Sequence, residues 1–203
     1  MTENWDFLLR GFLLGFSIAA PVGPIGVLCI RRTLADGRLT GFLSGLGAAS
    51  ADMLYGAIAA FGLTTVMGLL VGIQLWLRAV GGLFLLYLGV CTFFAKPADR
   101  AAQTRGTGLF AVYASTFLLT VTNPMTILAF LGMFSAILPT DGAPSPVSLV
   151  LGVFLGSAAW WLALSGLVGL VRERFTPEWM QWVNRFSGMI ITGFAIFILA
   201  GLF

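Results

Sequence analysis

Long apolar stretches separated by short polar segments dominate this chain. Six of them reach the length of about 20 mostly apolar residues that a helix needs to cross a bilayer. They cover about residues 7–30, 40–67, 74–95, 108–138, 147–171 and 186–203. None alternates apolar and polar residues as the strands of a membrane barrel do, so the pattern predicts helices. We expect an all-α integral membrane protein with six transmembrane helices in one domain, residues 1–203.

The composition excludes several other classes of protein. Of the 203 residues, 59% are hydrophobic and 9% are charged, whereas an average soluble domain is about 25% charged. So few charges cannot cover a soluble globule of this size. The sequence pI is about 9.3, but no soluble segment interleaves basic with aromatic residues as a nucleic-acid site would. We therefore expect the lipid bilayer as a partner and no nucleic acid.

The basic residues instead predict a topology. Nine of the eleven lie in three loops, residues 31–39, 96–107 and 172–185, and the loop at 139–146 has none. Cytoplasmic loops of membrane proteins carry an excess of Lys and Arg. The pattern places these three loops in the cytoplasm and, with six spans, both termini outside.

Helix-breaking residues inside the stretches are candidates for function. Pro21-Val22-Gly23-Pro24 interrupts the first stretch, because two prolines remove backbone donors and break the helix. In lipid, such a break persists only where it is buried in protein or lines a cavity. The alternative is a proline kink that shapes packing.

Thr122-Asn123-Pro124 lies in the fourth stretch, which is longer than one straight span requires. Asn123 can satisfy carbonyls freed by Pro124 or bind a polar ligand.

Asp52 is the only acidic residue expected at midmembrane depth, and Ser50 is the polar residue nearest to it in that span. Asp52 shares a helix face with Gly45, Ala48 and Gly56, and small residues at this spacing mark close helix packing. Its side chain should therefore point into the bundle, where burial disfavours the charged form. Asp52 is a candidate for proton coupling or for pairing with a substrate ammonium. The alternative is a structural hydrogen bond to a neighbouring helix.

Trp160 and Trp161 lie near the middle of the fifth stretch, although tryptophan is most frequent at membrane interfaces. They can pack against lipid or a neighbouring helix. Alternatively, they form a wall of a substrate pocket and offer a cation–π surface to an ammonium group.

The two halves of the chain show a weak internal repeat, about residues 7–95 and 108–203. Superposing Pro24 on Pro124 also matches the apolar residues that follow each proline. A unit of three spans is odd, so the second copy must insert with inverted topology. Inverted repeats with broken helices 1 and 4 near the midplane are typical of secondary transporters.

At these residues the chain resembles the LysE/RhtB family of amino-acid exporters. The family's Pro-Gly-Pro element corresponds to Pro21–Pro24 with Val22 inserted. Its glycine-rich second span with an intramembrane aspartate corresponds to Gly45-Leu46-Gly47 and Asp52, and its Asn-Pro to Asn123-Pro124. The resemblance implies a six-helix exporter of the bacterial inner membrane that moves amino acids or related small metabolites, driven by the proton motive force. The inserted valine and the sparse polar residues of the second span leave the substrate open.

Two other functions remain as alternatives. An exporter of metal or inorganic ions would need clustered ligands, and the chain has one midmembrane carboxylate and no histidine. The absence of histidine also disfavours an intramembrane enzyme with a Ser–His dyad. We expect no catalysis, metal site or cofactor, and the glycine-rich faces permit a homodimer.

The candidate substrate-binding or coupling residues are Asp52, Ser50, Pro21, Gly23, Pro24, Asn123, Pro124 and Trp161.

Overall fold

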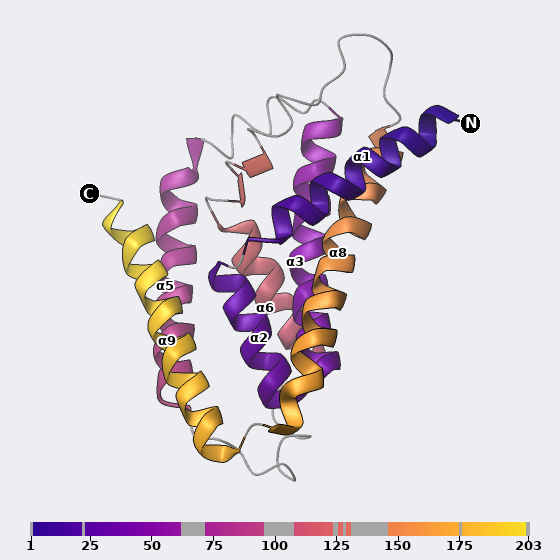
Figure 1. Ribbon diagram of the computed structural model, residues 1–203. Helices are drawn as coiled ribbons and strands as arrows, with labels where there is room; N and C mark the ends of the chain where they lie inside the picture. The colour runs from indigo at the N-terminus through magenta and orange to yellow at the C-terminus, as the bar shows by residue number, and fades with distance from the viewer. Residues whose placement is uncertain are drawn as a thin grey trace.

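A computed structural model describes residues 2–21, 23–61, 72–95, 108–123, 126–127, 129–130, 146–174 and 176–201. The regular secondary structure of these residues is helical, as the sequence predicts (Figure 1). In chain order, the elements are α1 (Thr2–Ala19), α2 (Pro24–Asp36), α3 (Arg38–Ala60), α5 (Gln74–Phe93), α6 (Leu109–Val121), α8 (Pro146–Val171), the 3₁₀ turn η2 (Arg172–Arg174) and α9 (Pro177–Ala200).

Several of these helices have the length and composition of membrane spans. In the described part of the chain, α3, α5, α8 and α9 qualify individually, and α1 and α2 qualify together as one span bent by 82°. The bend falls at Pro21–Pro24, where the sequence predicts a broken helix. Helix α6 has only 13 residues and ends at Val121, directly before Thr122-Asn123. The remainder of the predicted fourth stretch, from 131 onward, lies outside the described residues.

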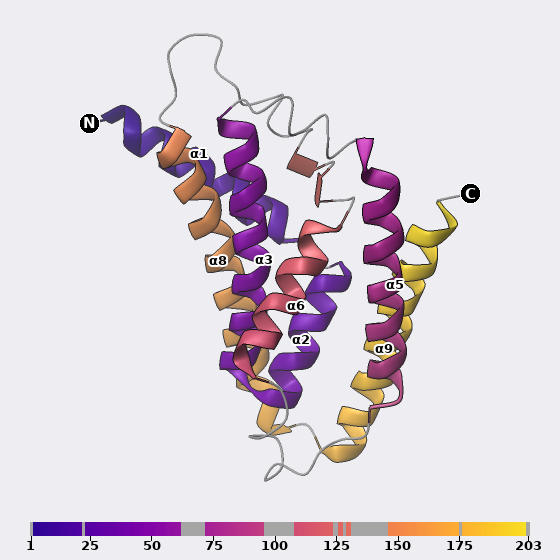
Figure 2. The same cartoon turned by 180° about the vertical axis from the view of Figure 1, so that it is seen from behind.

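The helices form a bundle with α2 at its centre. Helix α2 contacts α3, α6, α8 and α9, while α1 packs along α8 and α5 packs along α9. Figure 2 shows α3 and α6 side by side, in agreement with their contacts. The start of α1 and the end of α9 lie at the same end of the molecule in both views.

Burial separates interior helices from outward-facing ones. In α3, 61% of the most apolar window is buried, compared with 28% in α5 and in α9. Large apolar side chains such as Tyr87 and Phe197 are exposed on these two outer helices. In a membrane protein, such faces are suited to lipid contact. Helix α3, which carries Asp52, is therefore an inner wall of the bundle.

Helix α1 lies against α8 at unusually close range because glycines face each other. A Cβ atom on Gly11 or Gly15 would collide with the backbone of α8 at Leu149 or Val153. Conversely, a Cβ atom on Gly156 would collide with the backbone of α1 at Phe12. Small residues four apart are the usual means of close packing between membrane helices. This contact fixes the position of α1 on the bundle.

Two of the loops predicted from the charges are wrong in extent. Residues 31–36 continue helix α2, and the connection to α3 is Gly37 alone. Its φ of 103° lies in the region that favours glycine, which explains how one residue can turn the chain. Helix α9 begins at Pro177, nine residues before the predicted span. Pro177 suits the first helical position, and Thr176 Oγ1 accepts a hydrogen bond from Trp179 N.

Candidate functional site

A cavity of about 80 Å³ lies at the break between α1 and α2. Six of the eight residues singled out from the sequence line it, although they come from four separate parts of the chain: Pro21, Gly23, Pro24, Asp52, Asn123 and Trp161. Pro124 lies outside the described residues. Liquid water occupies about 30 Å³ per molecule, so the cavity has room for a few waters.

The start of α2 contributes backbone donors to this cavity. Pro24 occupies the first turn of the helix, and no side chain caps its N-terminus at Gly23. The amides at the start of a helix have no partner within that helix. Two residues of this first turn, Ile25 and Gly26, line the cavity. The broken span therefore presents uncapped helix amides and the positive end of the helix dipole to an internal space.

Asp52 on α3 contributes the acidic side chain of the site. Its side chain is only 3% exposed, and Ser157 on α8 donates a hydrogen bond to its Oδ2 at 2.7 Å. Trp161 Nε1 in turn donates to Ser157 Oγ at 3.2 Å. The structural hydrogen bond weighed as an alternative is therefore present. Because Asp52 also lines the cavity, this bond is compatible with a role in binding.

The end of α6 forms the opposite wall. The helix stops at Val121, and Thr120 and Asn123 line the cavity together with Thr126, where helical geometry resumes. The last carbonyls of a helix lack partners within it, and the hydroxyl of Tyr55 donates to the carbonyl oxygen of Val121. Helix α3 therefore holds the end of α6 one turn away from Asp52.

Two of the polar or aromatic candidates face elsewhere. Ser50 donates its hydroxyl hydrogen to Leu46 O at 2.9 Å on its own helix and does not belong to the cavity lining. Trp160 packs edge-on against Phe16, with ring centroids 5.3 Å apart, as the packing alternative anticipates. Trp161 is the member of the pair that forms a cavity wall.

Four polar residues at or beside the site were not selected from the sequence: Tyr55, Thr120, Thr126 and Ser157. Ser157 lies one helical turn before Trp161, and Thr120 lies three residues before Asn123. Helical spacing from the chosen residues would have suggested both. The partnership between Tyr55 and Val121 depends on how α3 and α6 pack, which spacing along the chain does not reveal.

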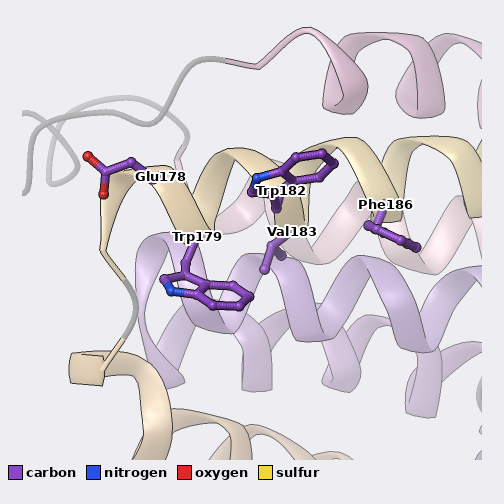
Figure 3. Close-up of a pocket in the computed structure, with 5 residues that line it drawn as sticks. All are labelled: Glu178, Trp179, Trp182, Val183 and Phe186. Atoms are coloured by element: carbon purple, nitrogen blue, oxygen red, sulfur yellow. The ribbon is translucent and has the colours of Figure 1, made fainter.

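A larger hollow of about 690 Å³ lies on the outer face of α9. Its described lining is Glu178, Trp179, Trp182, Val183 and Phe186 (Figure 3). The Arg185 guanidinium lies over the Trp182 ring, 5.6 Å from its centroid. None of the buried polar residues of the internal cavity contributes to this hollow. Its size therefore does not make it the better candidate for a polar substrate.

Comparison with known proteins identifies the family. The sequence model for LysE type translocators matches residues 16–201, which is nearly the whole chain and includes every residue of the cavity. The chain belongs to the LysE type translocator family. This confirms the resemblance drawn from the proline, aspartate and asparagine motifs. A LysE type translocator with several apolar helices is a multi-pass membrane protein, and its family is one of transporters rather than enzymes.

Curated relatives of this translocator cover most of its length. A Bacillus subtilis (strain 168) protein named "Putative amino acid efflux protein YcgF" is 26% identical over 95% of the chain and 94% of its own length. The membrane protein YahN of Escherichia coli (strain K12) is 30% identical over 82% of the chain and 77% of its own. No solved structure gives a significant match.

Proposed function

We propose that this translocator exports amino acids or related small zwitterions from the bacterial cytoplasm, coupled to proton movement, and that the internal cavity is its substrate site. The observation that carries the proposal is the pairing of opposite charges across one small space. The uncapped start of α2 and the buried carboxyl group of Asp52 both line the cavity. The efflux activity named for the relative YcgF supports the same class of substrate.

Each end of an amino acid has a partner in this arrangement. Helix N-termini bind anions through free amides and the helix dipole, so the first turn of α2 suits the substrate carboxylate. Asp52 suits the ammonium group, and Asn123 can contribute either a donor or an acceptor. The Trp161 indole forms a wall beside them. Half-helix ends that face a midplane site serve the same purpose in other secondary transporters.

The size of the cavity bears on the transport cycle. Small-molecule sites typically have volumes of about 300–1,000 Å³, several times that of the 80 Å³ cavity. This conformation is therefore closed around its site, and substrate entry requires the helices to separate. In the proposed cycle, Asp52 pairs with the substrate ammonium in one state and holds a proton in the other. A carboxylate that is buried without either partner is costly. Release of the substrate therefore favours binding of a proton, and the two are coupled.

We further propose that the chain is one transport domain built from two inverted repeats of three spans, about residues 7–95 and 108–203. The break in the α1–α2 span and the end of α6 before Asn123 support corresponding roles for the first helix of each repeat. In this topology the basic segments 31–39, 96–107 and 172–185 face the cytoplasm of the inner membrane, and both termini face outward.

The decisive experiment measures efflux from proteoliposomes that contain the purified protein and a set of radiolabelled amino acids, with and without a pH gradient. Deleting the protein in its host and profiling extracellular metabolites selects the set. We expect Asp52→Asn to abolish the response to the pH gradient, because an amide cannot exchange a proton. The matched control is Glu178→Gln, an exposed acid on α9. Full pH-dependent efflux by Asp52→Asn at normal abundance would exclude the proton role.

A further inference from the structure

Arg32, near the end of α2, joins three helices through its guanidinium group. Nη1 donates to Ser44 Oγ on α3 at 2.8 Å, and to Thr116 Oγ1 and Val112 O on α6 at 2.8 and 3.1 Å. Nη2 donates to Ser115 Oγ at 2.9 Å. Ser44 and Thr116 also lie 2.7 Å apart, within hydrogen-bond distance of each other. These contacts close α2, α3 and α6 around one positively charged group.

This cluster lies directly beyond the cavity on each of its helices. On α3, Ser44 is one turn from Ala48, and on α6, Thr116 is one turn from Thr120; both of these neighbours line the cavity. On α2, Arg32 lies six residues after Gly26, the last cavity residue of that helix. The guanidinium therefore lies between the cavity and the end of the molecule where α2, α5 and α8 finish, which we call the basic end.

The bonds that hold Arg32 are of a kind that can be exchanged. Within the described residues, its hydrogen-bond partners are three hydroxyl groups and one carbonyl, all neutral, and it forms no ion pair with them. A charged pair buried at this position would be costly to separate. Neutral hydroxyls can instead be replaced by water as helices part. The sequence pattern explains Arg32 only as a topology determinant, and the geometry adds a second use for its charge.

Two other arginines fasten the same part of α2. Arg31 Nε donates to Asn184 Oδ1 on α9 at 3.0 Å. Arg172 of η2 donates to the carbonyl oxygens of Leu34 and Ala35 at 3.0 and 2.8 Å. These bonds lie nearer the end of the helix or on other faces, whereas the Arg32 bonds join α3 and α6, which also line the cavity.

We propose that Arg32 is the gate residue between the cavity and the basic end. Its guanidinium closes the path by bonding α3 to α6, and the state open toward the basic end is the one in which these bonds are broken. The proposal rests on alternating access in the proposed function. Its test uses neither substrate nor a proton gradient, so the two can fail separately.

Cys29 is a native probe for this gate. It is 2% exposed and lies three residues before Arg32 and three after Gly26, between the gate and the cavity. With Cys91→Ala, the chain has a single thiol. Labelling by a membrane-impermeant methanethiosulfonate reagent in sealed vesicles then measures access to Cys29 from each side. A separate variant, Arg174→Cys without the two native cysteines, marks the side that exposes the basic end, because Arg174 is exposed on η2.

In Arg32→Gln, we expect the reagent to label Cys29 about tenfold faster when it is added from the side of the basic end. A tenfold increase in rate corresponds to the loss of one hydrogen bond to a charged group. Thr116→Val should also increase the labelling rate, and it leaves the arginine charge and Ser44 in place. An increase in this variant therefore reports access of the reagent to Cys29 rather than a change in the reactivity of the thiol. Arg174→Gln, with the same loss of charge at an exposed site, should label at the rate of the parent protein.

Three outcomes would overturn the proposal. One is unchanged labelling in both gate variants, provided that each elutes as a folded protein. Another is an equal increase from both sides of the vesicle, which indicates general loosening. The third is an increase in Arg32→Gln alone, since Thr116→Val removes a gate bond without changing the charge beside Cys29. If Arg32→Gln does not fold, Thr116→Val alone decides the result.

Discussion

Asp52 has a structural hydrogen bond, and we propose a transport role for the same side chain. The Ser157 hydroxyl stabilises one oxygen of its carboxylate, and the Trp161 indole orients that hydroxyl. Hydrogen bonds to a carboxylate favour its charged form, whereas burial favours the neutral form. These two influences oppose each other at a group that faces the cavity. In the proposed cycle, this carboxyl group exchanges a proton for a cationic ligand.

Tyr55 carries a prediction at the same scale. Tyr55→Phe removes the hydrogen bond that α3 donates to the Val121 carbonyl and leaves this partly buried acceptor at the end of α6 without it. We expect a loss of about 1–3 kcal/mol in stability and slower efflux, because the adjoining Asn123 loses its support. Thermal unfolding in detergent measures the first effect. Tyr87→Phe is the control, since that side chain is 62% exposed; equal destabilisation by both variants would contradict the assignment.

At the scale of elements, the sequence predicts what breaks a helix better than what continues one. Pro21–Pro24 marks the bend because proline lacks a donor wherever it lies. An apolar run does not predict the start of α9 at Pro177, because the first turns of this helix carry polar residues among the apolar ones. The predicted loop at 31–39 failed for a related reason: arginines mark a membrane boundary, but they do not end a helix.

The candidate site was predictable to the extent that its residues are unusual in a membrane. Asp52, Asn123 and the paired prolines are costly there, and the structure brings them to one cavity. Ser157 and Thr116 are common residues in membrane helices, and their roles depend on which helix faces them. Arg32 looked like an ordinary topology signal because its hydroxyl partners lie 12 and 83–84 residues away.

The contact between α1 and α8 supplies a prediction for a pair of elements. Gly156→Ala would place a methyl group against the backbone of Phe12, whose carbonyl carbon lies 2.8 Å from the Cβ position. Overpacking of this kind typically costs about 1–3 kcal/mol, and here the obstacle is backbone rather than a flexible side chain. Gly166→Ala on the same helix meets nothing within 4 Å and should be neutral or slightly stabilising.

Fluorescence-detected size-exclusion chromatography after heating would rank the two glycine variants against the parent protein. A lower midpoint for Gly156→Ala alone would support the close contact of α1 with α8. Equal midpoints for the two variants would show that α1 is free to move away from α8.

At the scale of the whole molecule, polar side-chain contacts between helices gather at the basic end. Besides the Arg32 cluster, Arg31 reaches Asn184, which donates in turn to Ala95 O at the end of α5. Arg172 joins η2 to α2. These bonds connect the ends of all the helices that meet there, so the closed state of that end is held by polar groups.

Arg172→Gln tests this connection. The substitution removes a charge that bonds two carbonyl oxygens at the negative end of the α2 dipole, and we expect it to lower stability by about 1–3 kcal/mol. Arg174→Gln, two residues away and exposed, should change stability little. Chemical or thermal unfolding of both variants in the same detergent gives the comparison. A loss no larger for Arg172→Gln than for Arg174→Gln would contradict this role.

The bend between α1 and α2 has a mechanical consequence. Helix α8 holds α1 through interlocked glycines, and the turn that follows α8 holds the far end of α2 through Arg172. Both arms of the bent span are thus attached to α8 or to the turn that follows it. Because Ser157 of α8 also donates a hydrogen bond to Asp52 on α3, a movement of α8 would carry both arms of the bend and that carboxyl group together.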